Sequence, residues 1–410
     1  MKPAGQLELQ PWMTAEATLA VMAALAAGGT QPRFVGGCVR DALLDRTVKD
    51  IDIATPDTPE IVTEKLATAG LKSIPTGVAH GTVTAVAHGQ PFEVTTLRRD
   101  LVTDGRHATV AFTDDWAEDA ARRDLTLNAI YCDLDGTLYD PVDGISDLRS
   151  GVIRFVGNAD DRIKEDVLRI LRFFRFFAHY SQGEIDAAGL RACRDHAHQL
   201  PNLSAERVCA ELLRLLSATN PAKTVGLMSE AGVIAQILPE GIFVDLLQHL
   251  AKIEEGLFFN DPLRRLCALC QPDKETAARL ARRLRLSKRQ KERLIAMSVI
   301  PDGLAPGISD TALRKMLYLE GGTAVADVAL LSQAKASLEE ADWQGLRNRI
   351  DAWTQPGLPV KGQDILDLGL PPGPRVGDLM RILEQWWIDQ DFNPDRKACL
   401  TKLERLISEA

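Results

Sequence analysis

Residues 33–55 read RFVGGCVRDALLDRTVKDIDIAT, and this stretch decides the fold of the N-terminal part of the chain. The apolar RFV predicts a short strand that enters a glycine turn, and CVRDALL predicts a helix that starts at this turn. DIDIAT alternates with a period of two residues, so Asp50 and Asp52 leave one face of a predicted strand and Ile51 and Ile53 the other. This order of elements predicts a small α/β domain.

Two aspartates on one face of a strand repel each other, and a divalent cation would offset the repulsion. Magnesium takes hard oxygen ligands, commonly one or two carboxylates together with substrate phosphates. Glu93 interrupts the apolar run PFEVTTL, which could form a strand beside DIDIAT and supply a third carboxylate. Gly36 and Gly37 would let backbone N–H groups approach a phosphate at the start of the following helix, and Arg40 adds positive charge. Each motif alone is commonly a plain turn or a solvated strand, but their order favours two-ion nucleotidyl transfer.

The whole chain has 410 residues, which corresponds to roughly two to four domains. A net charge of −9 argues weakly against nucleic acid as a partner unless a local basic face exists. The most apolar early run is too short to cross a bilayer, so we expect no membrane span. Seven scattered cysteines, including Cys267 and Cys270 in an apolar helical stretch, indicate core positions and a reducing compartment. We expect a cytoplasmic protein.

Strand patterns fill about the first 150 residues, and helical patterns fill the rest. GTVTAVAHG and PFEVTTL predict a hairpin, and AIYCDLDGTLYDP predicts two further short strands. ADDRIKEDVLRILRFFRFFAHY, residues 159–180, predicts one long helix, and breaks rich in glycine and proline fall at 300–310 and 355–377. The predicted class is α+β, with a mixed sheet and helices followed by helices alone.

Several motifs resemble, in the family's order, the class II tRNA nucleotidyltransferase and bacterial poly(A) polymerase family. They are GGCVRD, DIDIAT, HGTVTAV, FEVTTLR, DGRHATVAF, ARRDLTLNA, DPVDG, RIKEDVLRILRFFRF and LSAERVCAELLRLL. The resemblance covers roughly the first 220 residues, and VKGQDILDLGLPPGPRVGDLM near the end also resembles the family's C-terminal region. It implies a polymerase-β-like head (1–151), then a helical neck (152–220), body (221–310) and tail (311–410). Leu125 departs from the family, which commonly has Phe there.

The resemblance also implies roles for particular residues. Asp50 and Asp52 would hold two magnesium ions, with Glu93 as the third carboxylate. In ARRDLTLNA, Arg123 would lie near the triphosphate, and Asp124 and Asn128 near the ribose. Arg98 and Arg106 lie in the segment that is a flexible loop in the family, and their role stays open.

Asp166, Arg169 and Arg172 are spaced by three residues and would lie on one side of the predicted long helix. The ordinary interpretation is a surface salt bridge. However, cytosine and adenine each present an amino donor beside a ring-nitrogen acceptor, which an aspartate and an arginine complement. Uracil and guanine reverse this pattern, so a fixed Asp–Arg pair would accept CTP and ATP and reject UTP and GTP. The resemblance assigns this base-reading role to these positions.

A second basic stretch, LARRLRLSKRQKERL at 280–294, has charges of mainly one sign: Arg282, Arg283, Arg285, Lys288 and Arg289. Such a run is commonly a solvated face, but a basic helical stripe can also bind phosphates without reading sequence. It would suit the shape-based recognition of structured RNA. The resemblance implies that the body and tail grip tRNA.

The sequence therefore predicts an enzyme that adds CCA to tRNA 3′ ends from CTP and ATP and releases pyrophosphate. A bacterial poly(A) polymerase shares every head motif, and specialised CC-adding or A-adding enzymes are further alternatives. A non-catalytic RNA-binding protein with a relic head would have lost a carboxylate, whereas Asp50, Asp52 and Glu93 are all present. The sequence leaves the oligomeric state open.

Overall fold

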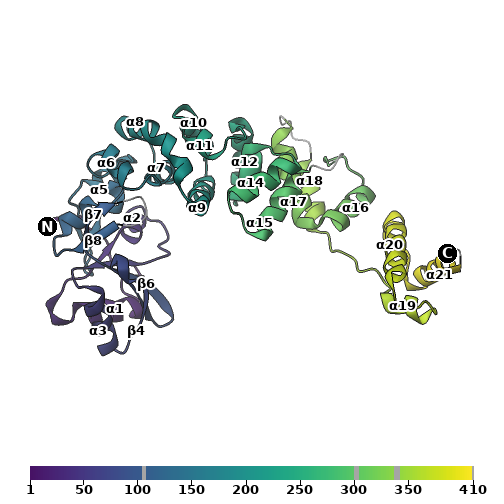
Figure 1. The fold of residues 1–410 in the computed structure, drawn as a ribbon, viewed down its shortest axis with the longest axis horizontal. Coiled ribbons are helices and arrows are strands. Elements are labelled where there is room, and N and C mark those ends of the chain that lie inside the picture. Colours follow the sequence, from purple (N-terminus) through teal and green to yellow (C-terminus); the bar gives the residue numbers. More distant parts are fainter. Residues whose placement is uncertain (104–107, 300–303, 337–341, 409–410) are drawn as a thin grey trace. The chain divides into compact units, whose positions relative to one another are not determined.

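A computed structural model describes residues 1–103, 108–299, 304–336 and 342–408 of the chain (Figure 1). The chain forms two compact units, Met1–Gly241 and Ile242–Ala410, called here the N-terminal and the C-terminal unit. Arg106 lies outside the described residues. The four predicted parts are finer than these two units, so their boundaries stay predictions.

One eight-stranded mixed sheet organises the N-terminal unit. Its strands follow the order β1 (Pro3–Gln6), β10 (Thr137–Tyr139), β9 (Tyr131–Cys132), β2 (Arg33–Val35), β3 (Asp52–Thr55), β6 (Gln90–Thr96), β5 (Thr82–Ala87) and β4 (Lys72–Gly77). Strands β5 and β6 form the predicted hairpin, and β3 and β6 run parallel. A separate two-stranded sheet pairs β7 (Arg98–Thr103) with β8 (Ala108–Phe112). The predicted mixed sheet is confirmed.

The glycine turn after β2 fixes the start of the next helix. Gly36 has φ +71° and ψ −121°, a conformation that residues with a Cβ rarely adopt. Helix α2 (Gly37–Leu43) follows at once, and buried Phe34 and Val39 anchor the strand and the helix in the core. Strand, turn, helix and strand therefore follow one another as the sequence predicts.

The helices of the N-terminal unit surround this sheet and continue beyond it. They are α1 (Glu16–Ala26), α3 (Pro59–Thr68), α4 (Trp116–Ala121), α5 (Gly144–Ser150), α6 (Ala159–Glu165), α7 (Arg169–Tyr180), α8 (Ala187–His196), α9 (Ala205–Leu216), α10 (Ala222–Glu230) and α11 (Val233–Ile237). A short 3-10 turn, Thr126–Asn128, precedes β9. Helix α7 buries its phenylalanines, and the rings of Phe155 and Phe173 stack with centroids 5.1 Å apart.

The prediction of one long helix over 159–180 is wrong, because the helix is interrupted at Asp166. This residue has extended backbone angles, φ −153° and ψ 106°, between α6 and α7. Its Oδ1 accepts a hydrogen bond from the Leu168 N–H at 3.1 Å. The aspartate therefore competes with the helical backbone and starts α7 instead of continuing α6.

The C-terminal unit is helical throughout its described residues, as predicted. It contains α12 (Val244–Gly256), α13 (Pro262–Cys270), α14 (Lys274–Arg283), α15 (Lys288–Ser298), α16 (Asp310–Glu320), α17 (Gly322–Lys335), α18 (Trp343–Asp351), α19 (Gly362–Asp367), α20 (Pro374–Asp389) and α21 (Arg396–Ser408). One core cluster includes Leu317 and Trp343, and another includes Trp387 and Leu403. All seven cysteines of the chain are buried. Among the described residues, we find no helix with the length and hydropathy that crossing a membrane requires.

Candidate active site

Two of the predicted carboxylates face each other across neighbouring strands. Asp52 of β3 is the direct partner of Glu93 in the parallel pairing with β6, and the Glu93 N–H donates to the Ile51 carbonyl at 3.2 Å. Directly opposed residues of paired strands project from the same face of the sheet. Burial and the neighbouring Glu93 carboxylate raise the pKa of Asp52 to about 6, against the opposing effect of Arg123. The site therefore concentrates negative charge.

Asp50 lies just before β3, because the strand begins at Asp52. It is exposed, while Ile51 and Ile53 are buried, so the predicted alternation of faces holds. Within the residues that the structure describes, no three His, Cys, Asp or Glu side chains lie close enough together to hold a metal ion. The expected set of three carboxylates is thus not already assembled, although Asp52 and Glu93 are adjacent in register.

The glycine turn and a buried arginine complete the surroundings of Asp52. A Cβ atom at Gly36 would lie 3.9 Å from the Asp52 Oδ2 and 3.8 Å from the Arg123 Nη1. The Gly36 N–H donates to the Ile130 carbonyl at 3.3 Å, which fixes the turn against the sheet. Gly36, Asp52 and Arg123 therefore converge, and Gly37 begins α2 beside them.

Arg123 is held in place by Asp119, a residue that the sequence interpretation missed. The Asp119 side chain is only 1% exposed and forms ion pairs with Arg122 (2.6 Å) and Arg123 (2.9 Å). Its Oδ2 also accepts from the Tyr131 hydroxyl at 2.7 Å. Burial alone would raise the pKa of Asp119, but Arg123 and Arg122 lower it to about 2. The spacing of DAARR puts Asp119 one helical turn before both arginines, which is the signal that could have revealed this cluster.

A chain of buried side chains links α2 to α7. The Arg40 Nη1 donates to the Asn128 Oδ1 at 2.7 Å, and the Asn128 Nδ2 donates to the Asp124 Oδ1 at 3.0 Å. The Asp124 Oδ2 accepts from the Arg172 Nε at 2.6 Å. Burial opposes ionisation of Asp124, but Arg172 beside it holds the pKa of this carboxyl well below its usual range. The chain ends at Glu211 of α9, 4.0 Å from the Arg172 Nη1. We call these five side chains the relay.

Further contacts surround both ends of the relay, at Arg40 and at Glu211. The Arg40 guanidinium lies 4.5 Å from the centre of the Tyr180 ring, and its Nε donates to the Asp41 Oδ1 at 3.0 Å. At the other end, Arg175 forms an ion pair with Glu211 at 2.7 Å. The glycine-turn helix is therefore attached to α7 by both charged and aromatic contacts.

The three predicted base-reading residues lie near the start of α7, but each has a different partner. Asp166 pairs with Arg207 of α9 (2.6 Å), and Arg169 pairs with Glu165 (2.5 Å). Arg172 pairs with Asp124 within the relay. Because Asp166 lies before α7, the three residues do not form one face of a continuous helix.

The predicted RNA-binding residues surround the turn between α14 and α15 in the C-terminal unit. Four are exposed and Arg283 is half-buried; the exposed ones are Arg282, Arg285, Lys288 and Arg289. In the described part of the chain, neither Arg285 nor Arg289 forms an ion pair, while Lys288 lies 4.0 Å from Glu292. In the N-terminal unit, Arg98 is the first residue of β7, not part of a loop, and its backbone N–H donates to the Asp119 Oδ1 at 3.4 Å. These placements test no binding role.

The paired carboxylates beside a glycine turn, on a mixed sheet followed by helices, define a nucleotidyltransferase with a polymerase-β-like head. The family model described as "Poly A polymerase head domain" matches residues 32–154. A second model, "Probable RNA and SrmB- binding site of polymerase A", matches residues 184–242.

Curated relatives cover most of the chain. The mitochondrial CCA tRNA nucleotidyltransferase 1 of Mus musculus is 34% identical over 91% of this chain and 86% of its own length. The CCA-adding enzyme of Streptococcus gordonii is 32% identical over 96% of this chain and 98% of its own length. The chain belongs to the family of CCA-adding tRNA nucleotidyltransferases.

Solved structures agree with this assignment. The CCA-adding enzyme of Bacillus stearothermophilus in complex with CTP is 27% identical, with a TM-score of 0.78, and 96% of this chain aligns with 98% of that one. The Thermotoga maritima CCA-adding enzyme complexed with tRNA is 20% identical over the full length of both chains and has a TM-score of 0.66, which shows a shared fold.

Proposed function

We propose that this protein adds CCA to the 3′ end of tRNA, using CTP and ATP without a nucleic-acid template. In each step the terminal 3′ oxygen attacks the α-phosphorus of the nucleotide. A new phosphodiester bond forms, the bond to the β-phosphate oxygen breaks, and pyrophosphate leaves with its charge. The observation that carries the proposal is the direct pairing of Asp52 with Glu93 beside Gly36, in a chain of this family.

The carboxylates fit magnesium. Asp52 and Glu93 offer hard oxygen ligands at adjacent positions, and Asp50 lies two residues before Asp52. Asp50 and Asp52 would hold two ions, with Glu93 as the third carboxylate and substrate phosphates completing the ligand shells. Bound magnesium would supply Lewis-acid stabilisation of the attacking and leaving oxygens. The raised pKa of Asp52 supports a site that needs positive charge.

The triphosphate would lie between the glycine turn and Arg123. Gly36 and Gly37 leave room for close approach, and Asp119 keeps the Arg123 guanidinium beside them. Asp124 and Asn128 would support the ribose from within the relay. Arg40 is buried against Asn128, so it acts by positioning this amide.

Base selection would need an exchange of ion-pair partners. Asp166 would leave Arg207, and Arg169 would leave Glu165, so that the pair could accept the amino group and donate to the ring nitrogen of cytosine or adenine. Arg172 would keep its place in the relay and hold the start of α7. The protein itself thus replaces a template.

The basic turn between α14 and α15 would contact tRNA phosphates through Arg282, Arg283, Arg285, Lys288 and Arg289. The exposure of Arg282, Arg285, Lys288 and Arg289 supports this role. Replacing one of them by glutamine should weaken tRNA binding and lower the salt dependence of affinity by about one counterion. The same proposal assigns catalysis to 1–151, base recognition to 152–220 and RNA binding to 221–310 and 311–410. A cytoplasmic location is part of it, and cell fractionation would check that location.

Product analysis tests the activity. A radiolabelled tRNA transcript that lacks its last three nucleotides would be incubated with the protein, magnesium, and CTP, ATP or both. Completion to CCA only with both nucleotides is expected. Stopping at CC, or adding A only to a CC end, would identify a specialised enzyme, and a long A tail on unrelated RNA would identify a poly(A) polymerase. A protein that incorporates nothing would contradict the proposal.

A further inference from the structure

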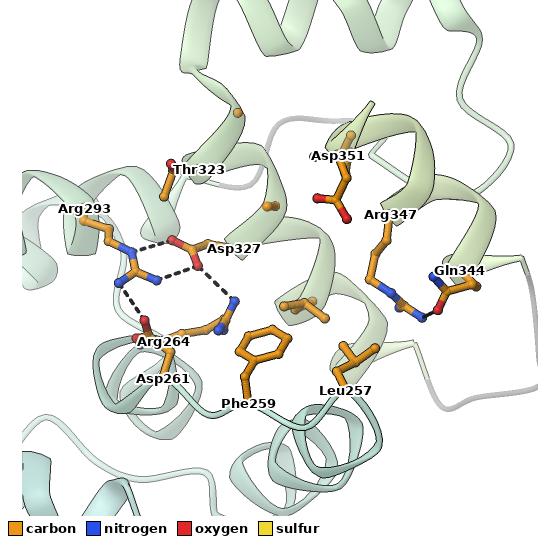
Figure 2. Close-up of a pocket in the computed structure, with 14 residues that line it drawn as sticks. Leu257, Phe259, Asp261, Arg264, Arg293, Thr323, Asp327, Gln344, Arg347 and Asp351 are labelled. Carbon is orange, nitrogen blue, oxygen red and sulfur yellow. Dashed lines mark hydrogen bonds and ion pairs between the residues drawn. The ribbon is translucent and has the colours of Figure 1, made fainter. Parts of the chain in front are cut away.

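The C-terminal unit contains a cavity of about 580 Å³ that the proposed function does not use. Residues of α13, α15, α17 and α18 and of the loop after α12 line it (Figure 2). Its volume falls within the range of small-ligand sites. Figure 2 shows Arg264, Arg293 and Asp327 on one side, Arg347 and Asp351 on the other, and the ring of Phe259 between them.

The first side of this cavity is electrically balanced. Asp327 pairs with Arg264 (3.1 Å) and Arg293 (2.7 Å), and Arg293 also pairs with Asp261 (2.7 Å). Glu254, fully buried, pairs with Arg264 at 2.8 Å. Because every arginine here has a carboxylate partner, this side offers no excess positive charge. The cavity therefore does not suit a polyphosphate.

The other side keeps unused hydrogen-bonding groups. The Nε of Arg347 is buried and has no hydrogen-bond partner within the described chain, while its Nη1 donates to the Gln333 Oε1 and its Nη2 to the Gln344 Oε1. Burial lowers the pKa of Arg347, and Asp351 one turn later opposes this effect. Asp351 is exposed and forms no hydrogen bond or ion pair with any residue that the structure describes. A donor and an acceptor thus line the same wall, which complements the edge of a planar heterocycle.

One aromatic residue lines the cavity, and its neighbour in the chain is an exposed aromatic residue. Phe259 lines it, is 45% exposed, and lies 5.1 Å from the Arg264 guanidinium. Phe258 is 97% exposed and has φ +58°, which bulky residues rarely adopt. Exposed aromatic faces of this kind stack on nucleobases with little dependence on sequence.

The cavity also adjoins the basic turn. A second hollow, of about 470 Å³, shares Arg293, Gly322 and Thr323 with the cavity and extends to Arg289. Arg289 is one of the residues proposed to contact RNA phosphates. A nucleotide with its base in the cavity could therefore have its backbone on this basic surface.

We infer that the cavity receives one unstacked base of the RNA substrate, stacked on Phe259 and hydrogen-bonded by Arg347 and Asp351. The inference rests on the proposed function, which makes tRNA the substrate. Structured RNA offers such bases in its loops, and proteins commonly recognise them by stacking and by their hydrogen-bonding edges. The paired part of the acceptor stem offers none, and the unpaired 3′ end is the part that the proposed function extends at the carboxylates, so the contact belongs to a loop of the tRNA.

Phe259→Ala in the full chain tests this inference, because this ring lines the cavity and is 45% exposed, so it can be removed without opening the core. Affinity for a complete tRNA transcript should fall about tenfold, the loss typical of one stacked base, with an unchanged salt dependence. Phe243→Ala is the matched control: this ring is 48% exposed in the same unit and lines a different hollow. It should bind tRNA like the unmodified protein, and an acceptor-stem duplex without a loop should bind all variants equally.

Photo-crosslinking gives an independent readout. A photoreactive phenylalanine analogue at position 259 should crosslink to one unpaired loop nucleotide of the tRNA. Wild-type affinity of Phe259→Ala for tRNA, an equal loss with the loop-free duplex, or crosslinks confined to paired stems would each overturn the inference. CCA completion by the unmodified protein is scored in parallel, so a failure of the proposed function would be recognised separately.

Discussion

Replacing Asp119 by asparagine would test how the head positions the triphosphate. The Asp119 carboxylate is buried, and it neutralises Arg122 and Arg123 while accepting from the Tyr131 hydroxyl. Asparagine has nearly the same shape and keeps one acceptor oxygen, but it removes the negative charge. Two arginines would then be left near each other without their shared partner.

The expected loss of stability follows from the ion pairs. Arg123 and Arg122 lower the pKa of Asp119 from its ordinary 3.8 to about 2, which corresponds to about 2 kcal/mol of stabilisation at neutral pH. Removing one partner of a buried pair commonly costs about 3–5 kcal/mol. Since asparagine still accepts a hydrogen bond, we expect a loss near the lower figure. The stabilisation exists above the unfolded pKa, so the difference between the two proteins should shrink as the pH falls from about 4 to about 2.

Activity should fall as well, because the two hydrogen bonds that hold Arg123 beside the site would lose their charged acceptor. A displacement of about 1 Å can cost on the order of 100-fold in rate, and we expect a loss of this order in kcat/KM for CTP and ATP alike. Asp133→Asn is the matched control, since Asp133 accepts from Arg33 and Tyr139 in the same unit, at 2.8 Å each. This control should lose stability and keep its kcat/KM. Asp119→Asn with wild-type kinetics would refute the positioning role.

Three further substitutions test other parts of the site. Asp52→Asn should abolish nucleotide addition. It should leave the metal-free protein at least as stable, because it relieves like-charge repulsion, and magnesium should raise the Tm of the unmodified protein only. A lower Tm of the metal-free variant would contradict this reasoning. Arg207→Gln should free Asp166 and change the ratio of kcat/KM for CTP over UTP about tenfold, whereas an unchanged ratio would exclude a role for this pair in selection. Gly36→Ala should lower the unfolding free energy by about 1–3 kcal/mol and impair activity, while Gly70→Ala, with a similar φ of +72° and no side chain nearby, should retain activity.

Much of the fold could be predicted because its signals are local. The alternation of DIDIAT reports directly on the faces of the strand, and the paired glycines report on a turn before α2; both predictions were confirmed. The break at Asp166 could not be predicted in this way, because the apolar period of three to four residues continues through it. It depends on a side chain that competes with the backbone and on an ion pair with Arg207, 41 residues later.

The sequence indicated the residues of the candidate site, but it did not indicate which side chains they contact. The charge of Arg40 suggested a phosphate contact, whereas the structure buries this guanidinium against Asn128 and Tyr180. Asp119 was missed because its role depends on Tyr131, which β9 brings in from another part of the sheet. The spacing of residues along the sequence shows little about pairing of this kind, even where every residue of the cluster can be identified.

The distribution of partners suggests how one site can serve two nucleotides. CTP and ATP share ribose and triphosphate, and the residues proposed for these groups belong to the relay or to the Asp119 cluster, where burial and multiple bonds fix them. The bases differ in size, and Asp166, which is proposed to read them, is held to Arg207 by a single half-exposed side-chain ion pair. Arg169 is held more firmly, because it pairs with Glu165 and also donates to the backbone carbonyls of Arg162 and Arg122. A single ion pair can be exchanged at small cost, whereas a buried network cannot. The buried residues can therefore hold the ribose and triphosphate that CTP and ATP share, while the exchangeable ion pair of Asp166 adjusts to the different bases. Double-mutant cycles should then show strong coupling within the relay and weak coupling between the relay and Asp166.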